Sequence, residues 1–270
     1  MSTGDPNAAG GIAVPRTVLA IDTATDSVVT GIVRVAGESF GDTTALAERA
    51  VADHRRHAEL LTTLVAECLA EAGVSRDALD AVVVGCGPGP FTGLRVGMAT
   101  GAAFADALGL PAYGVCSLDA LALDAAPDGA GVLVVTDARR REVYWATYRD
   151  GRRTRGPQVT APAAVAEELA ADIGAGTYPI AAGSASHLRL VGWTGADPEV
   201  TVPTPRGLAT AAAGRIVAGE TPEPLVALYL RRPDAVEQKE LKARKAQQAA
   251  EKAGTAKAGT DEARTLGAAT

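Results

Sequence analysis

A glycine-rich segment constrains this chain of 270 residues more than any other feature of its sequence. It reads Gly85-Cys-Gly-Pro-Gly-Pro-Phe-Thr-Gly-Leu-Arg-Val-Gly97 and lies between an apolar run and a segment with helical periodicity. Phosphate loops occupy such positions, but this one lacks the third glycine of a dinucleotide fingerprint and the Gly-Lys-Ser/Thr ending of a P-loop. Pro88 and Pro90 also remove two amide donors that a phosphate cradle would use. We favour a rigid turn that starts a helix close to a sheet.

The helix predicted after this turn contains a row of glycines, Gly93, Gly97 and Gly101, at four-residue spacing. Each glycine costs a helix about 1 kcal/mol relative to alanine, so close packing must offset the loss. The first alternative is that the row packs on the sheet beneath. The second is that this helix shares an exposed apolar face with the helix predicted at 57–72, and that this face meets another subunit. Met98, an adaptable apolar residue, would suit such a face.

The hydrophobic periodicity of the chain predicts an α/β protein. The predicted strands span 16–22, 28–35, 39–45, 80–85, 112–116, 131–137, 142–148 and 178–182. The predicted helices span 57–72, 92–108 (with Thr92 as N-cap), 117–125, 163–173, 184–191 and 208–218. Three strands followed by alternating helices and strands, and then by a similar alternation, predict two related lobes with mixed sheets. We place the N-terminal lobe at 16–116 and the C-terminal lobe at 117–235, with the last helices packing back on the first lobe.

Composition separates the two ends of the chain from this folded part and excludes several classes of protein. Residues 1–15 are rich in Gly, Pro, Ser and Asn and predict a flexible leader, and residues 236–270 form an Ala/Lys/Glu tail that is too polar to pack. A net charge of −6 and 4% aromatic residues disfavour a basic or ring-stacking nucleic-acid surface. Three cysteines without a CxxC pair, and no apolar run long enough for a membrane span, predict a cytoplasmic protein.

Few residues of the sequence stand in arrangements that are typical of catalytic or metal sites. Asp22 and Asp137 each end an apolar strand and precede a polar turn, where they either hold Mg²⁺ and phosphate between the lobes or cap the turns; we favour the caps. The segment from His54 to His57 has its histidines three residues apart with arginines between them, and we interpret it as solvated surface. Ser184 has no evident base in the sequence. We therefore predict no catalytic constellation and no metal site.

Several motifs together identify a family. They are Val18-Leu-Ala-Ile-Asp-Thr-Ala-Thr25, His57-Ala-Glu-Leu-Leu61, Gly87-Pro-Gly-Pro-Phe-Thr-Gly-Leu-Arg-Val-Gly97, Ser117-Leu-Asp-Ala-Leu121, Asp137-Ala-Arg-Arg-Arg-Glu-Val-Tyr144 and Tyr229-Leu-Arg231. In this order, over about residues 16–232, they resemble the bacterial TsaB proteins. The resemblance implies the two-lobed α/β fold of actin-like, Hsp70-like and sugar-kinase-like proteins, with a five-stranded mixed sheet in each lobe.

The resemblance also implies a function and partners. TsaB proteins act in forming N6-threonylcarbamoyladenosine at position 37 of ANN-decoding tRNAs, as non-catalytic partners of the transferase TsaD. The HxxxH metal motif of TsaD is absent from this sequence. The implied partners are TsaD, through a four-helix bundle of N-lobe helices, and the ATPase TsaE. Contact with tRNA would occur only through the complex, a homodimer would form in the absence of TsaD, and ATP or ADP with Mg²⁺ would bind, if at all, at the complex interface.

From the implied helix bundle we predict the residues that meet TsaD. They are Leu60, Leu61, Leu64, Cys68, Arg95, Met98, Gly101 and Ala102. Two further functions remain as alternatives. One is an ATP-dependent phosphotransferase with Asp22 and Asp137 around Mg²⁺, and the other, the least favoured, is a metallopeptidase.

Overall fold

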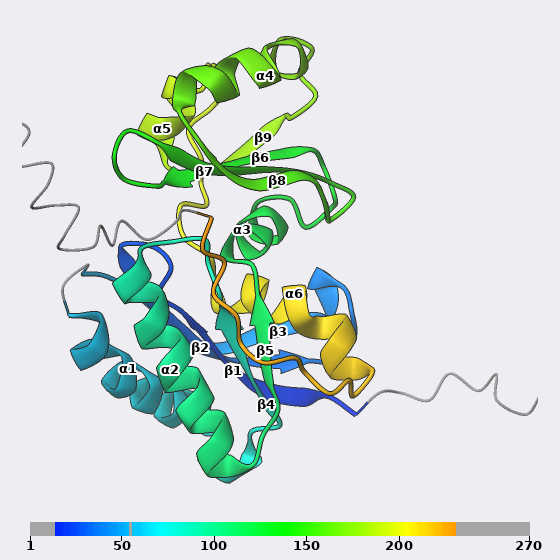
Figure 1. Cartoon of the computed structure of the whole chain (residues 1–270). Coiled ribbons are helices and arrows are strands. Elements are labelled where there is room, and N and C mark those ends of the chain that lie inside the picture. Colours follow the sequence, from blue (N-terminus) through cyan, green and yellow to red (C-terminus); the bar gives the residue numbers. More distant parts are fainter. Residues whose placement is uncertain (1–13, 54–55, 231–270) are drawn as a thin grey trace, which may run out of the picture. The chain divides into compact units, whose positions relative to one another are not determined.

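A computed structural model describes residues 14–53 and 56–230, and in this part the chain forms two lobes, each built on a mixed β-sheet (Figure 1). The predicted tail at 236–270, His54 and most of the predicted leader at 1–15 lie outside the described residues. Both sheets belong to one compact unit that ends at Leu230. Among the described helices, none is long and apolar enough to cross a membrane.

The first sheet has the strand order β3-β2-β1-β4-β5. Its strands are β1 (Arg16–Asp22), β2 (Ser27–Val35), β3 (Thr43–Ala52), β4 (Ala81–Gly85) and β5 (Ala112–Val115). The first three form an antiparallel meander, and β4 and β5 join it in parallel. Along β1, Leu19 and Ile21 face one apolar cluster while Val18 and Ala20 face another. The strand is therefore covered on both sides, which explains its continuous apolar run.

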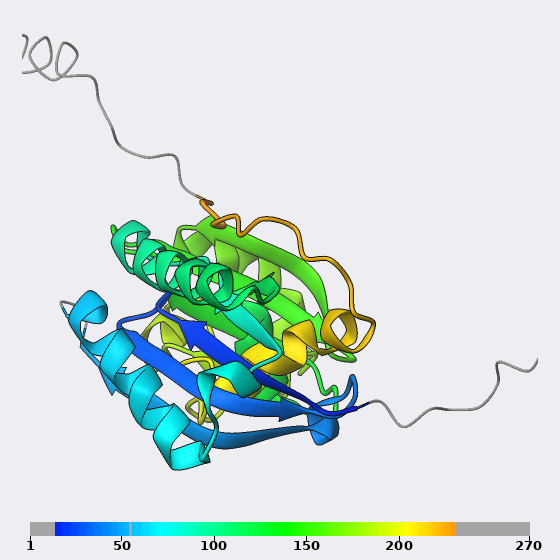
Figure 2. The same ribbon diagram turned by 90° about the horizontal axis from the view of Figure 1, so that it is seen from below.

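Helices cover both faces of this sheet (Figures 1 and 2). Helices α1 (His57–Ala72) and α2 (Phe91–Leu108) pack on one face, and α6 (Pro205–Val217) packs on the other. Helix α6 follows the second sheet in sequence but returns to the first. Gly73 and Gly109 end α1 and α2 with φ angles of 64°, the left-handed conformation that glycine adopts without strain.

The second sheet repeats the topology of the first. Its order is β8-β7-β6-β9, formed by β6 (Val132–Asp137), β7 (Val143–Arg149), β8 (Arg152–Thr160) and β9 (Ile180–Gly183). Strands β6, β7 and β8 are antiparallel, and β9 is parallel to β6, just as β4 is parallel to β1. Helices α4 (Pro162–Gly174) and α5 (Ala185–Leu190) pack on one of its faces. The prediction of two related lobes with mixed sheets is confirmed.

Two segments join the lobes. Helix α3 (Ser117–Ala125) contributes Ala120 to the core of the first lobe and Leu118 and Leu121 to that of the second. The segment 220–230 runs along both lobes, and the Leu228 amide donates a hydrogen bond to the Cys86 carbonyl (2.9 Å). The lobes are therefore joined by buried side chains of α3 and by half-buried leucines of the segment 220–230, with Leu225 against the first core and Leu228 against the second.

Several predicted boundaries are wrong. The third strand begins at Thr43 rather than Ser39, because Ser39 and Asp42 close a 3₁₀ turn, η1 (Phe40–Asp42), through mutual hydrogen bonds. Helix α2 begins at Phe91 with Pro90 as its N-cap, so Thr92 is not the cap. A second 3₁₀ turn, η2 (Arg76–Ala78), was not predicted.

Strand β8 was missed, and the count of strands implied for the second lobe is wrong. The residues of β8 are polar and largely exposed, so they show no apolar alternation. In the described residues the second sheet has four strands, where the family resemblance implies five.

The glycine row packs on the first sheet, which was the first of the two alternatives posed by the sequence; the second, a contact between the helix pair and another subunit, stays a prediction. A Cβ atom on Gly93 would lie 2.5 Å from the Thr23 carbonyl oxygen, and one on Gly101 would lie 2.5 Å from Val84 Cγ2. The Thr23 hydroxyl forms hydrogen bonds with two backbone groups of α2: it accepts from the Gly97 amide (3.0 Å) and donates to the Gly93 carbonyl (2.7 Å). The missing side chains let α2 lie directly on the end of β1.

Replacing Gly97 by alanine tests this close approach. The added Cβ would overlap the Thr23 hydroxyl, so Gly97→Ala should lower the free energy of unfolding by about 2 kcal/mol despite better helix propensity. Gly174→Ala is the matched control because nothing lies within 4 Å of its added Cβ, and it should leave stability unchanged or raise it by up to about 1 kcal/mol. Urea unfolding measures both, and equal stability of the two variants would contradict the account.

Candidate functional site

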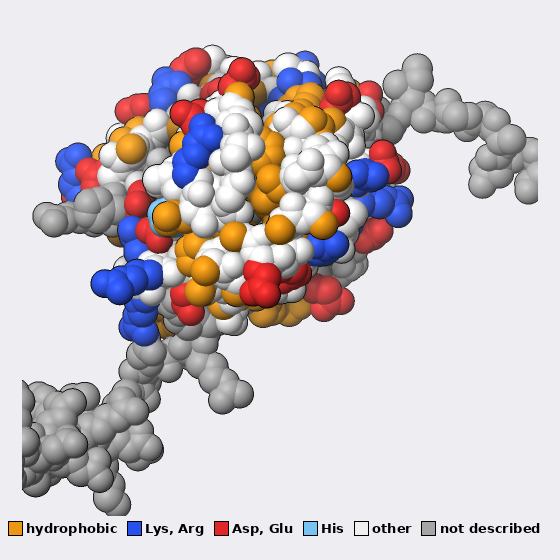
Figure 3. All heavy atoms as spheres, turned by 90° about the horizontal axis from the view of Figure 1, so that it is seen from above, with side chains coloured by type: hydrophobic (Ala, Val, Ile, Leu, Met, Phe, Trp, Pro, Cys, Tyr) orange, Lys and Arg blue, Asp and Glu red, His pale blue; other side chains and the backbone are white. Residues whose placement is uncertain are grey.

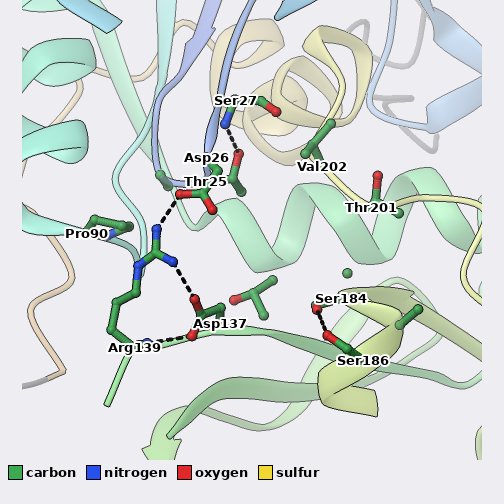
Figure 4. A pocket seen from close by; sticks show the side chains of 14 residues that line it. Thr25, Asp26, Ser27, Pro90, Asp137, Arg139, Ser184, Ser186, Thr201 and Val202 are labelled. Carbon is green, nitrogen blue, oxygen red and sulfur yellow. Dashed lines mark hydrogen bonds and ion pairs between the residues drawn. The ribbon is translucent and has the colours of Figure 1, made fainter. Parts of the chain in front are cut away.

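An open cavity of about 420 Å³ lies between the two lobes (Figure 4). The first lobe lines it with the turn after β1, from Ala24 to Ser27, and with Pro90 before α2. The second lobe lines it with the end of β6 and with the β9–α5 turn, including Ser184 and Ser186. The carboxyl ends of parallel strands β6 and β9 thus open on this cavity, the usual place for a ligand in an α/β sheet.

Arg139 bridges the lobes across the cavity, as Figure 4 shows. Its guanidinium lies 2.5 Å from Asp26 Oδ1 of the first lobe and 2.8 Å from Asp137 Oδ2 of the second. The backbone has positive φ angles, between 53° and 64°, at Arg139, Arg140 and Arg141. Each such residue other than glycine destabilises the folded chain by about 1 kcal/mol. The guanidinium therefore lies between the carboxylates of Asp26 and Asp137 and pairs with both.

Asp22 and Asp137 do not form the Mg²⁺ pair that was one of the sequence alternatives. Asp137 lines the cavity, whereas Asp22 does not and is fully buried. Each aspartate accepts a hydrogen bond from the amide two residues on, Ala24 (2.8 Å) and Arg139 (2.7 Å). Both are therefore turn caps, the alternative favoured by the sequence.

Asp22 also ties three elements of the first lobe together. Ser117 Oγ, at the start of α3, donates to Asp22 Oδ2 (2.5 Å) and accepts from the Gly87 amide (3.3 Å). A Cβ on Gly85 would overlap the same carboxylate. Burial raises the pKa of Asp22 to about 6, and the hydrogen bonds from Ser117 and Ala24 partly oppose that rise. The Asp22 carboxyl group therefore holds the glycine-rich turn in place through Ser117.

Ser184 and His187 form a polar pair that sequence reasoning missed. Ser184 Oγ lies 2.8 Å from His187 Nδ1, and His187 Nε2 lies 3.6 Å from Asp137 Oδ1. A signal was present, because a Gly-Ser step between a predicted strand and a predicted helix resembles the position of a nucleophilic serine. His187, three residues after Ser184, adds to that signal because a histidine can act as the base for a serine.

The predicted partner residues divide into two groups. Leu61, Leu64, Cys68 and Gly101 are buried, because α1 and α2 pack these side chains onto the first sheet. That part of the predicted surface is wrong for the free chain. The other four, Leu60, Arg95, Met98 and Ala102, are half-buried or exposed on the outer side of the two helices.

The outer side of α2 carries no charge over nearly three turns. Between Arg95 and Asp106 every residue is uncharged, and the exposed ones among them are the small residues Ala99, Ala102 and Ala103. A shallow groove of about 530 Å³ runs beside them, lined by Thr62, Arg76, Ala99, Thr100, Ala103, Phe104, Ala107 and Leu108. A solvated helix face is normally charged, so this face has the composition of a contact surface.

An aromatic cluster extends this face at the start of α2. Phe91 and Tyr229 are 47% and 44% exposed and stack with their ring centroids 5.3 Å apart. Arg95 lies over the Phe91 ring (3.9 Å) and donates to the Tyr229 hydroxyl (3.3 Å). Exposed aromatic rings beside an arginine are frequent in protein interfaces.

The other candidate groups are core residues. Cys68, Cys86 and Cys116 are buried free thiols, as predicted, and burial raises the pKa of each to between about 11 and about 12. His57 is 7% exposed, so its predicted place on a solvated surface is wrong. In the part of the chain that the structure describes, no cluster of three His, Cys, Asp or Glu side chains could hold a metal ion.

Comparisons with known proteins agree with this topology. The family model of TsaD, tRNA N6-adenosine threonylcarbamoyltransferase, matches residues 44–187. A crystal structure from Pseudomonas aeruginosa, of a protein with similarity to peptidase YeaZ, superimposes with a TM-score of 0.66 at 29% identity and covers 80% of this chain and all of that one. The chain therefore shares the two-lobed α/β fold of this YeaZ-like protein.

Relatives by sequence place the chain within that family. An uncharacterized protein of Mycobacterium tuberculosis is 52% identical over 219 residues, which cover 81% of this chain and 93% of the relative. A Mycobacterium leprae protein is 53% identical, and the chain spans 55% of its length. TsaB of Escherichia coli, a tRNA threonylcarbamoyladenosine biosynthesis protein, is 35% identical over 134 residues, or 49% of this chain and 54% of TsaB. The chain belongs to the TsaD family and is a TsaB/YeaZ-like member of it.

The buried carboxyl of Asp22 predicts a pH dependence of stability. Its pKa is about 6 in the folded chain against the ordinary aspartate value of 3.8, so the folded state holds the proton more tightly. The resulting stabilisation is complete below about pH 4 and is lost as pH rises through 6. Asp22→Asn should remove this loss, which amounts to about 3 kcal/mol.

Urea unfolding at pH 4, 5, 6 and 7 measures the effect. Asp77→Asn, on the exposed η2 turn, is the matched control and should keep the pH profile of the wild-type chain. If Asp22→Asn shows the same decline between pH 4 and pH 6 as the wild type, the account of Asp22 is wrong.

Proposed function

We propose that this chain is an accessory subunit in the synthesis of N6-threonylcarbamoyladenosine in tRNA, and that it binds a TsaD-type transferase through the outer faces of α1 and α2. Its family membership and its likeness to E. coli TsaB support the pathway. The observation that carries the proposed mode of binding is the uncharged outer face of α2.

The physical reason lies in the size and charge of the residues on that face. Ala99, Ala102 and Ala103 are small, so a second helix can approach α2 closely, as in helix pairs with small residues at the crossing. Met98 and Leu60 are half-buried at the edge of the first-sheet core and would complete their burial under a partner helix. Two helices from each protein would then form a four-helix bundle.

The inter-lobe cavity supports the accessory role over the phosphotransferase alternative. A phosphotransferase of this fold would need Mg²⁺ and phosphate near Asp22 and Asp137. In this chain Asp22 is buried beneath the turn, and Arg139 is ion-paired with both Asp26 and Asp137. A cation would have to displace an ion-paired guanidinium, so a nucleotide with Mg²⁺ fits better at an interface with the partner. The metallopeptidase alternative requires bound zinc, which elemental analysis of the purified chain would detect.

The remaining partners follow from the same proposal. Acidic and basic side chains are interspersed over the face seen from the side of α4 (Figure 3), an arrangement that favours contact with tRNA through the complex rather than through this face. TsaE would dock on the pair. The chain would act in the cytoplasm, and the same helix face would form a homodimer when no transferase is present.

A charge placed on the outer face of α2 tests the proposed interface. Ala102→Glu should weaken binding to the TsaD-type transferase of the same organism by about 100-fold, because an unpaired carboxylate would be buried at the helix crossing. Ala170→Glu, at an exposed position on α4, is the matched control and should bind like the wild type.

Calorimetry or surface plasmon resonance with the purified pair gives the affinities, and circular dichroism confirms that both variants fold. Unchanged affinity of Ala102→Glu would show that the outer face of α2 is not the binding surface. No binding by the wild-type chain would contradict the proposed partnership itself.

A further inference from the structure

The β9–α5 turn holds Ser184 at the edge of the inter-lobe cavity. Strand β9 ends at Gly183, whose φ angle is 99°, and α5 begins one residue after Ser184. The Gly183 and Ser184 amides donate to the carbonyls of Val200 and Val135, each at 2.8 Å, and fix the turn. A side chain at 183 would overlap the Val135 carbonyl. A serine on a sharp strand-to-helix turn, held by its backbone, is the arrangement of hydrolase nucleophiles.

A possible general base, His187, lies beside this serine. Ser184 is the N-cap of α5, but its hydroxyl makes no capping hydrogen bond and instead lies 2.8 Å from His187 Nδ1. The His187 side chain is 24% exposed, so it is partly shielded from solvent. Proton transfer from a serine hydroxyl to an adjacent imidazole activates the oxygen as a nucleophile.

The third member is Asp137. Its Oδ1 lies 3.6 Å from His187 Nε2, on the side of the ring opposite Ser184. A carboxylate in this place stabilises the imidazolium that forms when the ring takes the proton. Arg139 in turn holds Asp137 through its backbone amide and its guanidinium. The three side chains follow one another in the order serine, histidine, carboxylate, with Nδ1 at hydrogen-bond distance from the serine and Nε2 at ion-pair distance from the acid.

The cavity supplies room for a substrate. Ala185, the residue after Ser184, also lines it, and the amide after the nucleophile is the donor that holds the oxyanion in hydrolases with such a turn. Threonine and serine side chains form much of the remaining wall, including Thr25, Ser27 and Thr136. A volume of about 420 Å³ suits a short acyl group with a small leaving group.

We propose that Ser184, His187 and Asp137 form a nucleophilic site that hydrolyses small carboxylic esters, an activity separate from the accessory role proposed above. Ser184 Oγ forms a bond to the carbonyl carbon while its proton passes to His187 Nδ1. The bond from that carbon to the leaving oxygen breaks, and His187 returns the proton to the alcohol. Water then attacks the acyl-serine by the same route and releases the acid, so no oxidant or other co-reactant is needed.

Two probes test the site on the full-length chain. A fluorophosphonate should attach one phosphonyl group to Ser184 with loss of fluoride, and peptide mass spectrometry should locate it there. p-Nitrophenyl acetate should be hydrolysed faster than in buffer. Ser184→Ala should abolish the labelling, and His187→Gln should slow both reactions by about 100-fold, the usual contribution of a general base.

The matched control is Ser75→Ala, at an exposed serine before η2, which should react like the wild type. Wild-type chain that takes up no fluorophosphonate, or Ser184→Ala that hydrolyses the ester at the wild-type rate, would overturn the proposal. Binding of the transferase by Ser184→Ala should equal that of the wild type, so a failure of this inference and a failure of the accessory role give different results.

Discussion

The insertion of the Thr23 hydroxyl between the Gly93 carbonyl and the Gly97 amide is the interaction on which the rest of the first lobe depends. It joins the end of β1 to the first turns of α2, and it is possible because glycines leave the inner side of that helix bare. Asp22, one residue earlier, braces the glycine-rich turn through Ser117. With the inner side of α2 sealed against the sheet, its small outer residues are left as a face for another helix.

The second constraint is the way the two lobes are held. Helix α3 and the segment 220–230 share side chains with both cores, and Arg139 adds an ion-paired bridge across the cavity. The Arg139 guanidinium pairs with the carboxylates of Asp26 and Asp137, and Ser184, which contacts His187, also lines the cavity.

Sequence patterns were sufficient for the succession of strands and helices along the chain in outline, the helix ends at Gly73 and Gly109, and the buried cysteines, because these follow from local chemistry and periodicity. They failed where a residue's role depends on distant contacts. Strand β8 pairs through its backbone and shows no apolar alternation. Leu61 and Cys68 were predicted as interface residues because periodicity identifies the apolar side of a helix but does not distinguish a sheet from a partner protein as its neighbour. Both side chains are buried against the first sheet. The approach of Ser184 and His187 to Asp137 depends on the pairing of β9 with β6, which no short window of sequence contains.

The central claim is that this chain serves tRNA modification through the outer face of α2. Mass spectrometry of nucleosides from total tRNA tests it most directly, in cells depleted of the chain and supplied with either the wild type or Ala102→Glu. The account predicts that threonylcarbamoyladenosine falls on depletion, returns with the wild type and stays low with the variant. Unchanged modification after depletion would contradict the account.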